Sequence, residues 1–123
     1  MPDPQKLLEV TTTPAYVLAV INEKKILDEM VIQSISSELT SLVDARGPSV
    51  RLILDFGRVE HLSSAALGML ITLNKTIMER EGMLLLAAIS PQIVDVFRIT
   101  RLDKFFRMHT TVEQARMAIA AGK

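Results

Sequence analysis

Three residues whose side chains could supply a nucleophile and a base lie close together in the chain: His61, Ser63 and Ser64. In serine hydrolases a histidine accepts the proton of the serine hydroxyl, so that the oxygen can attack a carbonyl group. Such a serine usually lies in a frame like G-x-S-x-G on a sharp turn, and neither serine here has that frame. We therefore interpret His61 as an ordinary loop histidine and keep a small hydrolase as the less favoured alternative.

The sequence contains few residues that could form other kinds of chemical site. The chain contains no cysteine, which excludes disulfides, thiol nucleophiles and thiolate metal ligands. Its two histidines, His61 and His109, lie too far apart for a metal-binding motif, and no glycine-rich nucleotide loop follows an expected strand. We predict no catalytic residue, no bound metal and no cofactor.

The two adjacent serines precede a helical pattern, and either could cap that helix through its hydroxyl. Helices usually carry Asp or Glu in the first turn, yet residues 65–74 contain no charge. A phosphoryl group on Ser63 or Ser64 would bring about two negative charges to unpaired backbone N–H groups. The serines therefore predict either a simple helix cap or a modification site that alters a binding surface.

Residues 65–71 are apolar on every side of the expected helix. A neighbouring helix could cover the side that faces away from the sheet, or a partner protein could bind it through Ala65, Leu67 and Met69. The sequence leaves both interpretations open.

These residues are positioned by a regular alternation of strands and helices. Short apolar runs predict buried strands, whereas apolar residues at three- and four-residue spacing predict amphipathic helices. The expected strands cover residues 7–10, 16–21, 50–56, 83–89 and 105–108. The expected helices cover residues 28–45, 63–82 and 90–99, with a terminal helix after a capping box at 111–114.

This order predicts an α/β fold with a mainly parallel sheet, because buried strands that alternate with helices require right-handed crossovers. In such sheets functional groups collect at the carboxyl ends of the strands. The junctions of interest are residues 22–28, 57–64 and 89–91, and the second of them is expected to be a loop as far as residue 62.

The length and composition limit the number of domains and the kinds of partner to expect. The 123 residues suit one domain, 1–123, with residues 1–6 as a flexible lead-in. Fourteen basic and fourteen acidic residues give no net charge to attract nucleic acid or anionic lipid. No apolar stretch approaches the roughly 20 residues of a membrane span, and the first residues lack the order of a signal peptide. We expect a cytoplasmic protein that neither binds nucleic acid nor inserts directly into a membrane.

Residues 52–68, LILDFGRVEHLSSAALG, resemble the STAS domain of bacterial anti-sigma factor antagonists. The resemblance continues through Ala88-Ile89-Ser90-Pro91, Val96-Phe97 and Leu102 to Gln114-Ala115, and so covers residues 50–115. It implies a mixed, mainly parallel sheet of four to five strands with about four helices.

The resemblance also assigns individual positions. The family's loop is Asp-Ser-Ser/Thr-Gly-Leu-Gly, which places the phosphorylated serine on Ser64, the aspartate on Ser63 and the first glycine on Ala66. Ser63 is the alternative acceptor. At the first strand-to-helix junction, only Asp28 corresponds to the family's Gly-x-Leu/Ile-Asp motif. The expected partner-binding residues are Asp28, Ser63, Ala65, Leu67 and Met69.

The function implied by this resemblance is partner switching in the regulation of transcription. The unphosphorylated domain would bind an anti-sigma factor that is also an ATP-dependent serine kinase, and a serine phosphatase would reverse the modification. ATP would belong to the kinase, and the chain itself would not be an enzyme. The alternative is a constitutive scaffold or accessory subunit, in a stress-sensing assembly with other STAS domains or in a lipid-transport complex.

Overall fold

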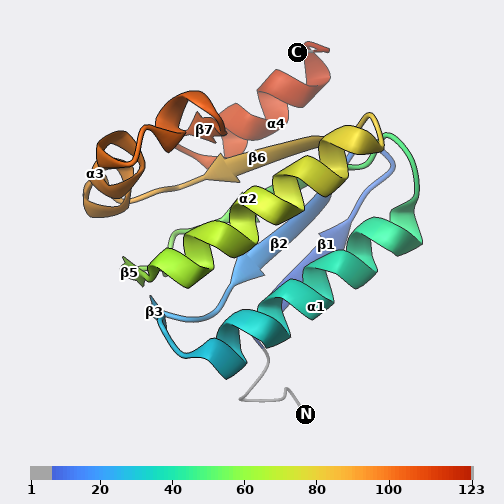
Figure 1. Cartoon of the computed structure of the whole chain (residues 1–123). Helices are drawn as coiled ribbons and strands as arrows, with labels where there is room; N and C mark the ends of the chain where they lie inside the picture. Colours follow the sequence, from blue (N-terminus) through green and yellow to red (C-terminus); the bar gives the residue numbers. More distant parts are fainter. Residues whose placement is uncertain (1–6, 123) are drawn as a thin grey trace.

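Five strands form one sheet in the order β1-β2-β4-β6-β7 in the computed structural model of the chain, which describes residues 7–122 (Figure 1). The strands of this sheet are β1 (Leu8–Thr12), β2 (Val17–Ile21), β4 (Arg51–Asp55), β6 (Met83–Ala87) and β7 (Arg107–His109). A second, two-stranded sheet pairs β3 (Lys25–Ile26) with β5 (His61–Leu62). The helices are α1 (Glu29–Arg46), α2 (Ser64–Glu79), α3 (Pro91–Ile99), the short 3-10 helix η1 (Leu102–Lys104) and α4 (Val112–Ala120). The lead-in predicted for residues 1–6 lies outside the described residues.

Strand direction follows from the length of each connection. β1 and β2 are joined by a short turn and pair antiparallel, with Leu8 opposite Ile21. Every other pair in the large sheet is parallel, because a helix lies between its two strands in the sequence. The prediction of a mixed, mainly parallel sheet with four α-helices is confirmed.

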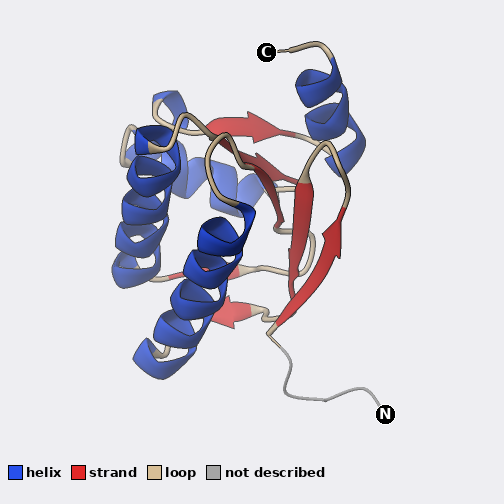
Figure 2. Ribbon diagram, turned by 90° about the vertical axis from the view of Figure 1, so that its right-hand side faces the viewer, coloured by secondary structure: helices blue, strands red, loops and turns tan. Residues whose placement is uncertain are grey.

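Helices cover both faces of the sheet. α1 and α2 lie side by side on one face, and α4 lies on the other (Figure 2). The larger core packs Leu39 of α1 and Leu70 of α2 with Leu54 of β4. The smaller core packs Ile119 of α4 with Leu85 of β6. Because successive strand residues point to opposite faces, a central strand covered on both sides must be apolar where it is covered, as β6 is along its length and β4 is from Leu52 to Leu54.

The predicted helix starts match the structure because each depends on a local cap. Asp28, Ser63, Ser90 and Thr111 all have extended backbones, and each side chain accepts a hydrogen bond from the first turn of the following helix. Gly47 ends α1 with a φ of +81°, a conformation that glycine adopts without a steric penalty.

Several expectations about strands were wrong. β1 continues to Thr12 instead of ending at residue 10, and β6 ends at Ala87 instead of residue 89. Residues 57–62 were expected to form only a loop, yet His61 and Leu62 form β5. The last strand was expected to begin at Phe105, but it begins at Arg107. Phe106 is buried and its ring lies 5.4 Å from that of Phe97, so this phenylalanine packs against α3 before the strand begins.

No helix among residues 7–122 is long and apolar enough to cross a lipid bilayer.

Candidate functional site

The candidate site lies where the chain leaves β2 and β4 and enters α1 and α2. β3 and β5 pair in parallel at this end of the molecule and hold the two junctions together. The carbonyl of Lys24 accepts from the N–H groups of Glu60 at 2.7 Å and His61 at 3.0 Å. The Ser63 N–H donates to the Ile26 carbonyl at 3.1 Å. Segments whose paired residues lie 36 positions apart in the sequence therefore form one structural unit at the site.

Ser63 is the N-cap of α2. Its hydroxyl oxygen accepts a hydrogen bond from the N–H of Ala66 at 3.1 Å, and its carbonyl accepts the first helical bond, from Leu67. Serine and aspartate are similarly good N-caps, so serine can fill this position without changing how the helix begins. The Ser63 oxygen is thus already engaged in holding the helix terminus.

Ser64 is the first residue of α2, and its side chain is exposed. Its hydroxyl makes no hydrogen bond to any residue from 7 to 122. The first turn of α2 has no acidic residue, whereas α1 has Glu29 and α4 has Glu113. The first turn of α3 also lacks an acid, but no hydroxyl follows its Ser90 cap within that turn. Only α2 therefore combines an accessible hydroxyl with a helix start that no carboxylate occupies.

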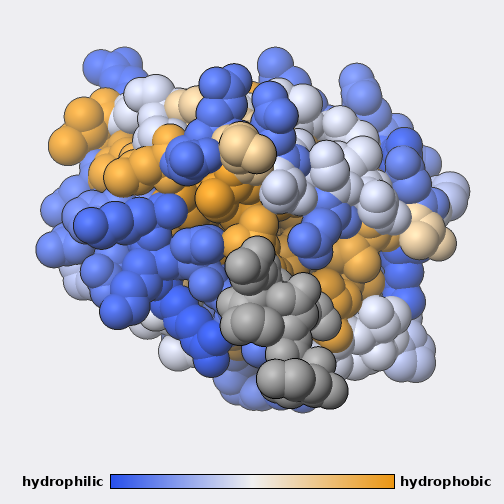
Figure 3. Space-filling view, turned by 90° about the horizontal axis from the view of Figure 1, so that it is seen from below, coloured by the Kyte–Doolittle hydropathy of each residue, from blue (hydrophilic) through white to orange (hydrophobic). Residues whose placement is uncertain are grey.

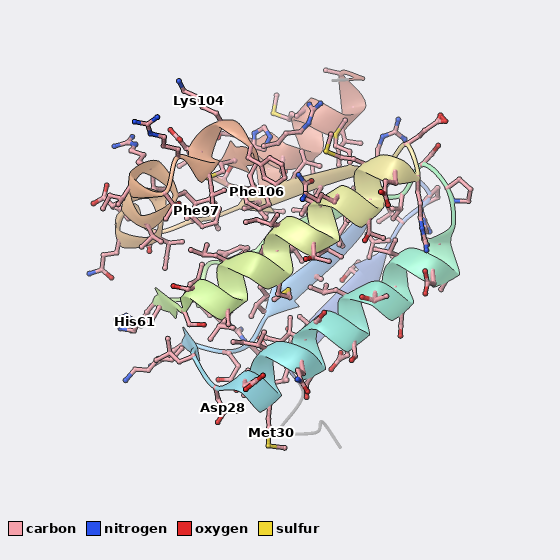
Figure 4. All side chains as sticks on the ribbon, viewed as in Figure 1. Asp28, Met30, His61, Phe97, Lys104 and Phe106 are labelled. Atoms are coloured by element: carbon pink, nitrogen blue, oxygen red, sulfur yellow. The ribbon has the colours of Figure 1, made fainter. Side chains whose placement is uncertain are left out.

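Asp28 lies at the start of α1, two residues after Ile26. Its carboxylate accepts from the N–H of Met30 at 2.7 Å and, less closely, from that of Val31 at 3.4 Å. Figure 4 shows Asp28 and His61 toward the same end of the molecule. Asp28 therefore has a local structural role as a cap, at the same end of the molecule as His61.

Two apolar residues on this surface were missed by the sequence analysis. Leu27 is 51% exposed and Met30 is 78% exposed, on either side of Asp28. Leu27 precedes α1 and is not part of it. Met30 lies outside the row of apolar residues at three- and four-residue spacing along α1. This position in the sequence was the available sign that its side chain would be exposed. Apolar atoms reach the surface on the lower side of the molecule, where α1 begins (Figure 3).

A groove between α1 and α2 continues this surface. Its lining residues come from both helices: Ile32, Gln33, Ser36, Ser37, Ala65, Gly68, Met69 and Thr72. Ala65 is exposed and Met69 is half-buried, as a binding surface requires. α1 therefore covers part of the apolar side of α2 and leaves part of it open, and partner binding at the open part stays a prediction.

Leu67 does not belong to the exposed surface. It is only 8% exposed and packs in the larger core, so its prediction as a partner contact is wrong. Leu67 lies three residues before Leu70 on α2, and that spacing places both side chains on the face that packs inward. Because residues 65–71 are all apolar, the sequence did not show which of them would be buried on the inward face.

His61 does not form a nucleophile and base arrangement with either serine. Its side chain is exposed and lies at the outer end of β5 (Figure 4), and its ring makes no hydrogen bond to Ser63 or Ser64. Within residues 7–122, no group of three or more His, Asp or Glu side chains could hold a metal ion. The site thus offers a hydroxyl, a helix terminus and an apolar surface, which suit protein binding better than hydrolysis.

Comparison with known proteins places this geometry among related domains. The family model described as the STAS domain matches residues 9–115. A relative from Bordetella bronchiseptica strain RB50, assigned as the anti-sigma factor antagonist BtrV, is 30% identical over 86 residues. That match covers 70% of this chain and 72% of the relative.

Two solved structures share the fold at low sequence identity. An anti-sigma factor antagonist from Mycobacterium paratuberculosis is 20% identical with a TM-score of 0.79, and the match covers 98% of this chain and 99% of that one. The Bacillus cell fate determinant SpoIIAA in its phosphorylated form is 18% identical with a TM-score of 0.68. That match covers 91% of this chain and 98% of SpoIIAA.

Proposed function

The chain belongs to the STAS domain family of anti-sigma factor antagonists, and on that basis we propose that it is a binding protein switched by phosphorylation of Ser64. Without the modification, it binds an anti-sigma factor that is also a serine kinase, and thereby regulates transcription. It acts in the cytoplasm and has no catalytic activity of its own.

The observation that carries this proposal is the difference between two adjacent hydroxyl groups. Ser63 is bound to the N–H of Ala66, whereas Ser64 is exposed on the first residue of α2. An incoming kinase can reach the Ser64 oxygen without breaking the helix cap. Ser63 is the poorer acceptor because its modification would disturb the hydrogen bond that starts α2.

The chemical step is the transfer of one phosphoryl group. The Ser64 oxygen attacks the γ-phosphorus of ATP held by the kinase, the bond to the β-phosphate oxygen breaks, and ADP leaves while the hydroxyl proton is lost. The product carries about two added negative charges next to the positive end of α2, which helps to stabilise it. A phosphatase restores the hydroxyl by hydrolysis.

The switch follows from where this charge appears. Ser64 directly precedes Ala65, which lines the groove with Gln33 of α1, and Gln33 also lines a neighbouring hollow with the exposed Met30. A partner that covers these grooves would cover this surface. A partner that buries these apolar side chains would also have to remove water from a doubly charged phosphate, which is unfavourable without a matching cation. Phosphorylation therefore releases the partner without unfolding the domain.

A second candidate is a constitutive scaffold or accessory subunit. Ser63 alone accounts for the cap of α2, and the exposed Leu27 and Met30 could pack against another STAS domain with no modification of Ser64. Light scattering on the unmodified protein separates the two candidates. A stable high-order assembly favours the scaffold, whereas a monomer or weak dimer favours the switch.

The test of the proposal uses the anti-sigma factor kinase that the protein captures in a pull-down. The kinase, magnesium and ATP are incubated with wild type, Ser64→Ala and Ser63→Ala, and the products are analysed by mass spectrometry. We expect one phosphoryl group on wild type and on Ser63→Ala, and none on Ser64→Ala. An unmodified Ser64 in wild type, with the same kinase active on another substrate, would refute the switch.

A further inference from the structure

The charge of this protein is distributed very unevenly along the chain. Residues 1–97 contain eight basic and twelve acidic residues, whereas residues 98–123 contain six basic and two acidic ones. The net charge of zero therefore hides an acidic first part and a basic last part. The absence of net charge does not exclude local attraction to an anionic surface, because such attraction acts over about 8–10 Å at physiological salt.

Three of these basic residues have no ionic partner. Within residues 7–122, the ion pairs are Arg80–Asp44, Arg98–Asp95 and Arg116–Glu113. Arg101, Lys104 and Arg107 are exposed and lie within seven consecutive positions, at the turn between α3 and β7. Asp103 is the only acidic residue among those positions, and it is half-buried. Figure 4 shows the Lys104 side chain pointing away from the body of the protein.

Apolar side chains protrude beside these cations. Ile99, at the end of α3, is 81% exposed, the largest exposed fraction of any large apolar side chain described. Phe105 is 39% exposed, and its ring stands edge-on against Phe106 at 5.0 Å. Phe106 in turn packs against Phe97 in the core, so Phe105 is held at the surface by a buried aromatic pair. We call Ile99, Arg101, Lys104, Phe105 and Arg107 the basic face.

We propose that the basic face binds the surface of an anionic lipid membrane reversibly. Lysine and arginine near such a surface are attracted to its acidic headgroups, and neighbouring apolar side chains can enter the boundary between headgroups and acyl chains. Ile99 and Phe105 would do so here while Arg101, Lys104 and Arg107 contact the headgroups. The interaction is peripheral and needs no membrane-spanning segment.

The shape of this region favours a membrane over a peptide. Peptides that bind through side chains usually lie in a groove that receives their apolar residues. The groove beside α3 is lined by Ile89, Val94, Arg98, Met108 and neighbouring residues, and by no member of the basic face. The groove between α1 and α2 is also lined by other residues. Side chains that protrude outside both grooves fit a soft, nearly planar partner.

The proposal concerns residues other than those of the Ser64 site, so either can fail without the other. The test is co-sedimentation of the full chain with vesicles of phosphatidylcholine alone, or with about one third phosphatidylserine. We expect binding to the anionic vesicles only, and its loss at about 0.5 M salt, where the screening length is a few Å.

Variants identify the residues responsible. Lys104→Glu should weaken binding to anionic vesicles at least fivefold, since each cation contributes about a factor of five. Ile99→Ser should also weaken it severalfold while the fold is retained, because the Ile99 side chain is almost fully exposed. Lys75→Glu and Met78→Ser, at exposed positions of α2, are the matched controls and should bind like wild type. Circular dichroism checks that each variant is folded.

Three results would overturn the proposal. The first is equal binding to neutral and anionic vesicles, or to neither. The second is an equal loss of binding in Lys104→Glu and Lys75→Glu. The third is salt-sensitive binding to polyglutamate without binding to anionic vesicles, which would assign the basic face to an acidic protein instead.

Discussion

The carbonyl oxygen of Ile26 accepts a hydrogen bond from the backbone N–H of Ser63 at 3.1 Å. Ile26 comes just before α1 and Ser63 caps α2, so this bond connects the entrances of the two helices. A partner that contacts the start of α1 is therefore close enough to be affected by a change at Ser64. This relationship holds the two helix starts together as one structural unit.

Replacement of the two serines by alanine should affect stability differently. Ser63→Ala removes the cap of α2 and should lower the free energy of unfolding by about 1 kcal/mol. Ser64→Ala removes an exposed hydroxyl without a partner and should change it by less than about 0.5 kcal/mol. Urea unfolding followed by circular dichroism measures both values. Equal losses would contradict the assignment of Ser63 as the cap.

A negative charge at position 64 should weaken partner binding. Ser64→Glu is expected to reduce affinity for the anti-sigma factor at least tenfold, about 1.4 kcal/mol, while the fold is retained. Isothermal titration calorimetry against the captured partner gives the dissociation constants. Ser41→Glu, at an exposed position further along α1, is the control for charge alone. The electrostatic switch is wrong if Ser64→Glu and wild type bind equally well.

Two substitutions of Asp28 separate its roles as cap and as partner contact. Asp28→Ala removes the bond to the Met30 N–H and should cost about 1 kcal/mol of stability. Asp28→Asn keeps a comparable cap and should be close to wild type in stability. If the partner recognises the carboxylate, Asp28→Asn will nevertheless bind it more weakly. Unchanged affinity would leave Asp28 with only its role as a cap.

Substitution of Leu67 should mainly lower stability, whereas substitution of Met69 should mainly lower partner affinity. Leu67→Ala removes a buried core side chain and should cost about 2–5 kcal/mol of stability. Met69→Ala affects a half-buried side chain in the groove between α1 and α2, and should cost less stability but reduce partner affinity. Thermal unfolding combined with calorimetry distinguishes them. A larger loss of stability in Met69→Ala would contradict the observed packing.

Two glycines offer a matched pair for alanine substitution. A Cβ at Gly82 would lie 2.5 Å from the carbonyl oxygen of Val50, so Gly82→Ala should destabilise the fold by about 1–3 kcal/mol. A Cβ at Gly68 would meet nothing within 4 Å, and Gly68→Ala should stabilise α2 by about 0.5–1 kcal/mol. Urea unfolding midpoints compare the two. A stable Gly82→Ala variant would show that β4 can shift away from this residue.

Much of the fold could be predicted because its signals are local. A cap such as Ser90 followed by Pro91 fixes a helix start within a few residues, and the apolar runs of β4 and β6 identify buried strands by length and composition. The two-residue strands β3 and β5 could not be predicted in this way. Each is too short to show a period, and both exist only because distant segments pair.

Part of the candidate site could also be predicted, because the positions of some of its residues depend on local signals. Ser64 and Asp28 could be identified from the sequence, since their places depend on the start of a helix and on the family resemblance. Leu67 was misplaced, and Met30 was missed, because burial depends on how a helix is rotated against its neighbours. The sequence pattern within 65–71 was apolar in every direction and contained no information on that rotation.

By itself, the sequence determined the alternation of the longer strands and helices, the caps Ser90 and Thr111, and a pair of serines at the start of an uncharged helix. Capping and periodicity act between residues a few positions apart, so they can be recognised without coordinates. The tertiary structure decided that Ile26 meets Ser63, that the Ser63 hydroxyl is occupied while Ser64 is exposed, and that Phe106 is buried against Phe97 while Phe105 stays partly exposed. These relationships depend on contacts between distant segments and on the balance of packing across the whole sheet, which no local pattern specifies.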